Sequence, residues 1–182
     1  MMKNHPFLMA LGVLTFVTHS AVAGMLGVSE SDQTIMNKLN QGSISEIHTA
    51  QTVIQRSSEP EVKQLAQRII DDHTTLMKEI QSWADKNKVQ LSSTAESEPN
   101  KMSSLTSANF DQRYVQAMLE DHNKDVSDVA KYIDEHPKSS VTPILKKNLP
   151  NLEDHLRIAE NAAGKIGLKP DLGLNHKTRE TA

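Results

Sequence analysis

The sequence of 182 residues contains no cysteine and few aromatic residues, with one tryptophan, two tyrosines and three phenylalanines. Without cysteine the fold forms no disulfides, and thiolate metal sites and cysteine nucleophiles are excluded. With so few aromatic side chains, we expect a hydrophobic core of aliphatic residues, supplemented by some of the eight methionines.

Long hydrophobic runs are absent beyond the N-terminal region. Residues 7–17 form an apolar stretch of eleven residues, which is too short to span a bilayer. Lys3 precedes this stretch, and Ala21 and Ala23 follow it in the Ala-x-Ala pattern that signal peptidase recognises. We therefore predict a secretory signal peptide over residues 1–23 that is cleaved after Ala23. The protein is then exported, periplasmic or otherwise secreted, and has no integral membrane segment after processing.

An excess of positive charge is also missing, since the formal net charge is −3 at pH 7. A mildly acidic chain with scattered lysines is not typical of a nucleic-acid-binding protein. The chain has no glycine-rich phosphate loop, no G-x-S-x-G and no H-E-x-x-H motif. These absences argue against a conventional enzyme. The sequence identifies no protein partner, and a homo-oligomer stays open.

What the sequence does contain is helical periodicity through most of its length. Four segments carry apolar residues at three- and four-residue spacing, the pattern of amphipathic helices. They cover about residues 31–57, 58–88, 108–135 and 140–164. The predicted organisation is a signal peptide over 1–23, a linker over 24–30, a four-helix bundle domain over 31–165 and a loosely ordered tail over 166–182.

The lengths of the connections predict how the helices are arranged. The links near Ser58 and Pro137 are short, so each joins an antiparallel helical hairpin. The polar segment of about eighteen residues between the second and third helices is long enough to run the ~40 Å length of a bundle. Two hairpins joined by one long crossover define a ferritin-like four-helix bundle, which makes the fold all-α. The predicted core includes Leu65, Ile69, Leu76, Ile80, Met118, Val126, Leu152 and Ile158.

Local signals refine the helix boundaries. Ser58 and Glu61 fit a capping box at the start of the second helix, and Gly164 is a candidate end of the fourth. The sequence Asn40-Gln41-Gly42 is a candidate break in the first helix. Ser43 and Glu46 would fit a capping box for a helix that restarts there.

Three acidic pairs are each followed by histidine, ending at His73, His122 and His155. Each histidine lies on the apolar stripe of its helix. At 1.5 Å per residue, Glu46 and His73 lie at nearly equal heights in the first hairpin, and His122 and His155 do so in the second. The pattern predicts a polar layer at mid-bundle, where helical bundles often build metal sites.

The expected ligands are His73, His122, His155 and Glu46, holding one divalent transition-metal ion such as zinc, copper or iron. Candidates to orient these ligands are Asp72, Asp121, Asp154 and Tyr114. Di-iron chemistry is disfavoured, because Ile70, Leu119 and Leu152 stand three residues before the histidines, where the Glu-x-x-His pattern needs glutamate. The alternative is an interaction or structural module of the cell envelope, in which the buried histidines only hydrogen-bond to one another and specify the packing of the core.

The chain resembles a known family in residues spread over about 32–163. The similarity rests on Glu46, on Ala66-x6-His73 with Asp72, on Phe110-Asp111-x-x-Tyr114, on His122, and on Leu149-Pro150-x-Leu152-x-x-His155-Leu156. This combination is similar to the family of the domain of unknown function 4142, whose members are often labelled outer membrane proteins. The resemblance implies a secreted bacterial protein with a ferritin-like four-helix bundle, and it implies no particular activity.

Overall fold

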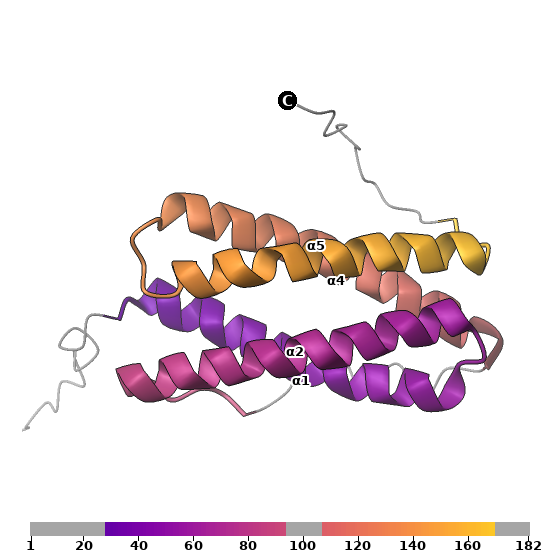
Figure 1. The fold of residues 1–182 in the computed structure, drawn as a ribbon, viewed down its shortest axis with the longest axis horizontal. Helices are drawn as coiled ribbons and strands as arrows, with labels where there is room; N and C mark the ends of the chain where they lie inside the picture. The colour runs from indigo at the N-terminus through magenta and orange to yellow at the C-terminus, as the bar shows by residue number, and fades with distance from the viewer. Residues whose placement is uncertain (1–27, 94–106, 170–182) are drawn as a thin grey trace, which may run out of the picture.

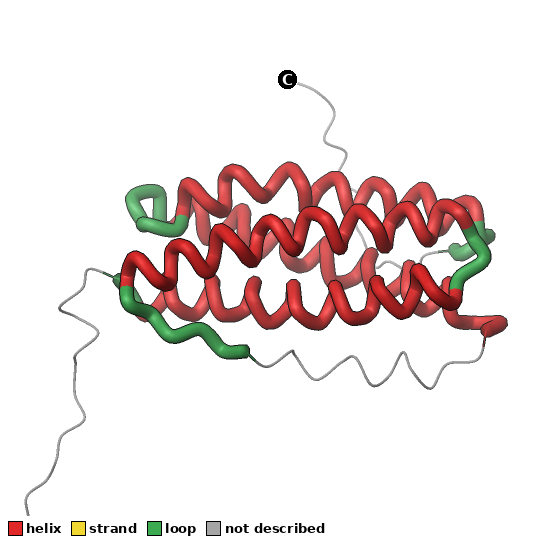
Figure 2. Tube along the Cα trace, turned by 60° about the horizontal axis from the view of Figure 1, so that its bottom comes forward, coloured by secondary structure: helices red, strands yellow, loops and turns green. Residues whose placement is uncertain are grey.

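The computed structural model describes residues 28–93 and 107–169, and these residues form helices and loops without a strand (Figure 2). The four helices are α1 (Glu30–Arg56), α2 (Pro60–Asn87), α4 (Ser107–Glu135) and α5 (Thr142–Lys165). None of them carries an apolar stretch long enough to cross a membrane. The predicted signal peptide lies outside the described residues, as do most of the predicted linker, of the long connection and of the C-terminal tail.

The helices form the predicted ferritin-like bundle (Figure 1). α1 packs along α2 and α4 packs along α5, each pair as an antiparallel hairpin, and α2 lies beside α5. α2 and α4 run in the same direction, so the end of α2 and the start of α4 lie at opposite ends of the bundle. This direction separates the ferritin-like connection from a simple up-and-down bundle. The all-α fold and its two-hairpin arrangement are therefore confirmed.

The helix ends have identifiable causes. Ser29 caps α1 because its side chain accepts a hydrogen bond from the Asp32 backbone N–H at 3.0 Å, so the helix begins within the predicted linker. α2 ends where Lys88 adopts a left-handed backbone conformation with φ of 56°. α5 ends similarly at Gly167, with φ of 66°, where the Leu168 N–H bonds to the Ala163 carbonyl at 2.9 Å. The predicted end at Gly164 is wrong, because Gly164 lies inside α5 and Gly167 supplies the left-handed residue of the C-terminal motif.

Two other candidate signals are not realised in the structure. α1 continues through Gly42 without a break, so Ser43 and Glu46 cap no helix there. α2 begins after Glu59, which makes no side-chain cap, and Ser58 is exposed. The Glu59 N–H instead bonds to the hydroxyl of Ser57 at 3.0 Å. At the start of α2, a local hydrogen bond from the chain before the helix thus takes the place of the expected capping box.

The hydrophobic core consists of two clusters, one toward each end of the bundle. Of the predicted core residues, six are buried: Leu65, Ile69, Leu76, Ile80, Met118 and Leu152. Val126 and Ile158 are only half-buried and pack against the edges of the clusters. Ile158 does so because it lines a surface groove between α2 and α5. The polar residues predicted for mid-bundle lie between the two clusters.

Candidate metal centre

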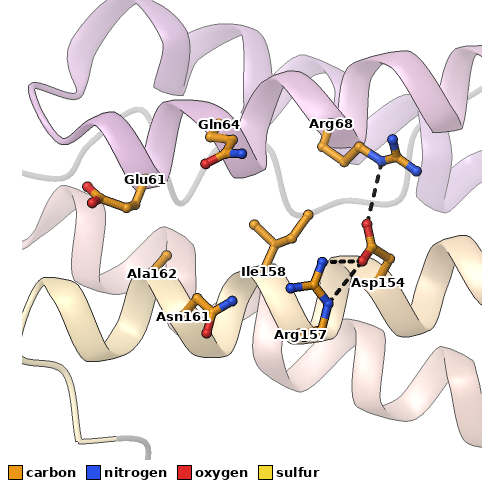
Figure 3. A pocket seen from close by; sticks show the side chains of 8 residues that line it. All are labelled: Glu61, Gln64, Arg68, Asp154, Arg157, Ile158, Asn161 and Ala162. Carbon is orange, nitrogen blue, oxygen red and sulfur yellow. Dashed lines mark hydrogen bonds and ion pairs between the residues drawn. The ribbon is translucent and has the colours of Figure 1, made fainter.

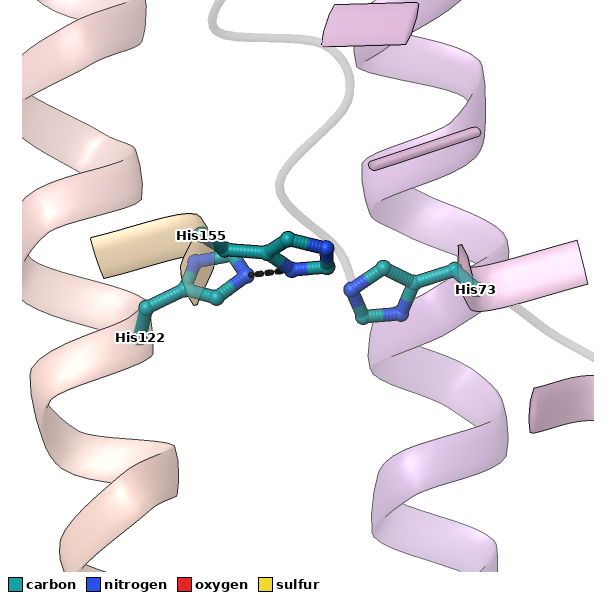
Figure 4. Close-up of side chains that lie close together, drawn as sticks. All are labelled: His73, His122 and His155. Atoms are coloured by element: carbon teal, nitrogen blue, oxygen red, sulfur yellow. Dashed lines mark hydrogen bonds between the residues drawn. The ribbon is translucent and has the colours of Figure 1, made fainter. Parts of the chain in front are cut away.

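Three histidines from three helices meet at the middle of the bundle (Figure 4). His73 on α2, His122 on α4 and His155 on α5 are 5%, 1% and 1% exposed. Each ring can present one nitrogen so that the three nitrogens all lie within 4.8 Å of one another. Glu46 on α1, which is 8% exposed, brings the fourth helix into the same layer.

The His122 ring is oriented by the backbone of its own helix. Its Nδ1 lies 3.1 Å from the carbonyl oxygen of Met118, one turn earlier in α4. Because a carbonyl oxygen only accepts, this nitrogen must carry the hydrogen and donate it. The Nε2 atom of a neutral His122 therefore carries a lone pair, and it points at Nδ1 of His155 at a distance of 3.0 Å.

The His155 ring is oriented by a carboxylate from another helix. Its Nε2 lies 2.9 Å from Oδ2 of Asp72 on α2. The same oxygen lies 2.7 Å from Nε of Arg68, one turn earlier in α2. An ionised carboxylate only accepts hydrogen bonds, so His155 Nε2 donates to it, as in the carboxylate–histidine pairs that orient metal ligands.

The chain of contacts from Met118 through His122 and His155 to Asp72 is one hydrogen short. It contains three close contacts, of 3.1, 3.0 and 2.9 Å. Two neutral imidazoles supply only two N–H hydrogens. If the outer contacts use both, two lone pairs face each other between His122 Nε2 and His155 Nδ1. A cation between these nitrogens, either a proton or a metal ion, resolves the conflict.

His73 faces the same point from the opposite helix pair. Its Nδ1 lies 2.8 Å from the hydroxyl of Ser43 on α1, which orients the ring. Its Nε2 lies 3.2 Å from Oε2 of Glu46, and this nitrogen makes no hydrogen bond of normal geometry with any described residue. Oε2 of Glu46 is also 3.6 Å from His122 Nε2. One carboxylate oxygen therefore lies between two imidazole nitrogens.

These separations match the edges of a small coordination shell. Zinc binds imidazole nitrogen at 2.0–2.1 Å in tetrahedral sites, which places neighbouring ligand atoms about 3.3–3.4 Å apart. The observed separations of 3.0, 3.2 and 3.6 Å lie on both sides of that value. The three imidazole nitrogens together lie within 4.8 Å of one another, a wider spacing than this shell allows, so the rings must move inward before three nitrogens and one oxygen can surround one ion.

The electrostatics of the layer favour neutral histidines. Burial lowers the pKa of His122 to about 3, and repulsion from His155 adds to this effect. Burial and the two neighbouring rings likewise hold the pKa of His73 well below its usual value. Burial lowers the pKa of His155, while the hydrogen bond to Asp72 opposes the shift. Neutral imidazole is the form that ligates a metal.

The other predicted site residues lie around this layer in different ways. Asp72 contacts His155 directly. Asp154 instead pairs with Arg157 and Arg68 on the surface (Figure 3). Asp121 lines a groove between α1 and α4. Tyr114 is fully buried on α4, its hydroxyl has no hydrogen-bond partner among the described residues, and burial with the nearby charge of Glu46 raises its pKa well above the usual value.

The sequence-based prediction did not include three participants, namely the side chains of Ser43 and Arg68 and the backbone carbonyl of Met118. Ser43 was interpreted as part of a capping box, although its three-residue spacing from Glu46 places both on one helical face. Arg68 stands one turn before Asp72 and matches an i, i+4 ion pair, a signal that could have been read from the sequence. The backbone carbonyl of Met118 leaves no signal in the sequence.

Comparison with known proteins identifies the family and the fold. The family described as "Domain of unknown function (DUF4142)" matches residues 17–162. No curated protein matches the chain. Among solved structures, a DUF305 fragment from Deinococcus radiodurans is similar with a TM-score of 0.66 and 15% sequence identity, covering 76% of this chain and 98% of that one. At this identity the likeness supports the helical-bundle fold alone.

Proposed function

From the premise that the chain belongs to the DUF4142 family, we propose that it is an exported bundle protein that binds one divalent transition-metal ion. The proposed ligands are Nε2 of His73, Nε2 of His122, Nδ1 of His155 and a carboxylate oxygen of Glu46. Such a protein would serve in metal sequestration or in protection against metal stress in the cell envelope. Export rests on the signal-peptide pattern of residues 1–23.

The observation that carries the proposal is the missing hydrogen between His122 and His155. Both rings have their outer nitrogens at oxygen acceptors, and their inner nitrogens face each other at 3.0 Å. The inner nitrogen of His73 points into the same space without a hydrogen bond to any described residue. A single cation would satisfy all three nitrogens, whereas a single proton satisfies only one pair.

Zinc suits this donor set best among the candidate metals. Three of the separations lie close to the edge of a tetrahedral shell, whereas copper(II) prefers tetragonal geometry. One glutamate and three imidazoles give the bound ion only one compensating negative charge. The site also lacks the bridging carboxylates that a pair of iron ions requires. Sequestration therefore fits better than oxygen activation.

Metal titration of the untagged protein tests this proposal. Zinc affinity is measured by competition with a chromophoric chelator, and cobalt(II) serves as a spectroscopic probe of tetrahedral coordination. We expect one ion per chain, and removal of a ligand in His122→Ala should weaken zinc binding by more than the ~10–100-fold typical of residues that only orient ligands. The control His48→Ala changes an exposed histidine on α1 and should bind as the wild type does. Binding of zinc that is equal in His122→Ala and wild type would exclude the site.

A second candidate function has its own observation. The hydrogen bonds from His155 to Asp72 and between His73 and Ser43 could serve only to fix core packing in an interaction module of the envelope. In that case zinc leaves the melting temperature unchanged. A metal held by the native state alone raises it, because binding adds RT ln(1 + [L]/Kd) to the stability.

A further inference from the structure

A groove between α1 and α4 lies on the side of the bundle where Glu46 joins the polar layer. The groove has a volume of about 230 Å³ and is lined by Gly42, Ser45 and Glu46 from α1 and by Asp121 and Asp125 from α4, among others. Glu46 belongs both to this groove and to the histidine layer, since its Oε2 lies 3.2 Å from His73 Nε2. A proposed ligand residue therefore forms part of the groove wall.

The packing of the helices explains why the groove forms there. α1 and α4 contact each other far less than the other neighbouring helices do. Small residues face the gap at Gly42 and Ser45, and a Cβ atom at Gly42 would meet nothing within 4 Å. On one side of the groove Lys38 of α1 connects the two helices, with ion pairs of 2.9 Å to Asp125 and 2.7 Å to Asp128.

The opposite side of the bundle offers a cation a worse approach. There the groove between α2 and α5 is lined by Arg68 and Arg157, with Asp154 paired to both (Figure 3). Arg68 also pairs with Asp72, the residue that separates this surface from His155. This groove is lined by two guanidinium groups and two carboxylates, whereas the groove between α1 and α4 is lined by two lysines and three carboxylates, so the latter is the more acidic approach for a divalent ion.

We infer that the groove between α1 and α4 is the route by which a divalent cation reaches and leaves the histidine layer, with Glu46 as its first ligand. This inference rests on the proposed metal-binding function. The carboxylates of Asp121 and Asp125 lie on the route, and the two lysines that line it, Lys38 and Lys124, are engaged in ion pairs with carboxylates of α4. The ion exchanges water for the carboxylate of Glu46 and then for the imidazoles.

Filling the groove tests the route without touching a ligand. Gly42→Leu places a side chain into the open space beside Glu46, and Gly42→Ala provides a smaller step. The matched control is Gly164→Leu, because Gly164 is also helical with nothing within 4 Å of a built Cβ, and it lies outside the groove. Circular dichroism confirms that each variant keeps its helices.

The measurement is stopped-flow uptake of cobalt(II) and its release to excess chelator. A narrowed route slows passage in both directions, so Gly42→Leu should lower both rate constants by about tenfold or more while Kd stays within a few-fold of the wild type. Gly164→Leu should leave both rates unchanged. In addition, Asp121→Asn should slow uptake at low ionic strength and less so at high salt, because electrostatic steering is screened.

The outcomes separate the two proposals. If the wild type takes up no cobalt or zinc, both the metal-binding function and the route fail. If it binds metal and Gly42→Leu has wild-type kinetics, the route alone is excluded. Equal slowing in Gly42→Leu and Gly164→Leu would also exclude the route, since the effect would then come from helix stability.

Discussion

Nε2 of His122 lies 3.0 Å from Nδ1 of His155, and the other nitrogen of each ring faces an oxygen acceptor. The two acceptors are the Met118 carbonyl and the Asp72 carboxylate, and each selects the ring tautomer that directs a lone pair inward. The pair is thus organised by residues outside the layer. Changing Asp72 should therefore alter metal binding without removing a ligand, whereas the Met118 carbonyl belongs to the backbone and is kept by any substitution.

Asp72→Asn should weaken zinc binding by about 10–100-fold, the usual effect of losing a residue that orients a ligand. Asparagine has nearly the same shape, but its amide can donate to His155 Nε2 and so favour the tautomer with hydrogen on Nδ1. Asp154→Asn is the control, because Asp154 also pairs with Arg68 but forms no hydrogen bond with a histidine ring. Chelator competition measures both affinities. Equal losses in the two variants would mean that general charge, rather than the orientation of His155, controls affinity.

Acid should destabilise the metal-free protein over a window set by the histidines. The folded pKa of His122 is about 3 and that of His73 is also lowered, so the unfolded chain binds protons first, near pH 6.5. This contribution to the free energy of unfolding is complete above about pH 6.5 and falls as the pH drops toward the folded pKa. The carboxylate of Asp128, with a pKa of about 2, contributes only in more acidic solution.

Urea unfolding at pH 7, 6 and 5 measures this slope. In His122→Gln the loss between pH 7 and 5 should be smaller than in the wild type, because one buried titrating ring is gone. In His48→Gln, where the ring is exposed, the loss should match that of the wild type. A wild-type stability that stays constant from pH 7 to 5 would contradict neutral burial of the histidines.

Much of the fold could be predicted because the helical signal is long and repeated. The stripe from Val62 to Trp83 is buried as expected, and the short link at Ser57 fixes the first hairpin. What failed were signals of a few residues. Glycine in a helix interior costs ~1 kcal/mol, which makes Gly42 a candidate break, yet α1 is continuous there because helices in proteins are stabilised mainly by packing of their apolar face.

The heights of the site residues were predictable, but their partners were not. Counting residues from the hairpin turns placed Glu46 level with His73 and His122 level with His155, and both pairs are close in the structure. The carboxylate that orients His155 is Asp72 of α2 rather than its own neighbour Asp154. Adjacent residues on a helix point about 100° apart, so such a pairing depends on how each helix is rotated in the bundle. The sequence alone does not determine that rotation.

Ser43→Ala should lower the free energy of unfolding by roughly 1–3 kcal/mol, because it leaves Nδ1 of the buried His73 without its hydrogen-bond partner. Ser58→Ala is the comparison. A capping box would make Ser58→Ala cost about 1 kcal/mol. In the structure, however, Ser58 is exposed and Glu59 stands at the cap position. Urea denaturation should therefore show a large effect at Ser43 and a change within about 0.5 kcal/mol at Ser58. A larger loss of stability in Ser58→Ala than in Ser43→Ala would support the capping box at the start of α2. It would also contradict the role of Ser43 in orienting His73.

Alanine substitutions at Gly42 and Gly167 should change stability in opposite directions. Gly42 is inside α1 with open space around it, so alanine should stabilise the helix by about 1 kcal/mol through its higher helix propensity. Gly167 has φ of 66°, where a Cβ atom is strained, so alanine should destabilise the end of α5 by roughly 1 kcal/mol or more. Urea unfolding at pH 7 measures both, and the metal-free protein is used so that binding does not alter the comparison. A destabilising Gly42→Ala would show that α1 requires flexibility at this point, in conflict with a continuous helix that holds Ser43 and Glu46 against His73.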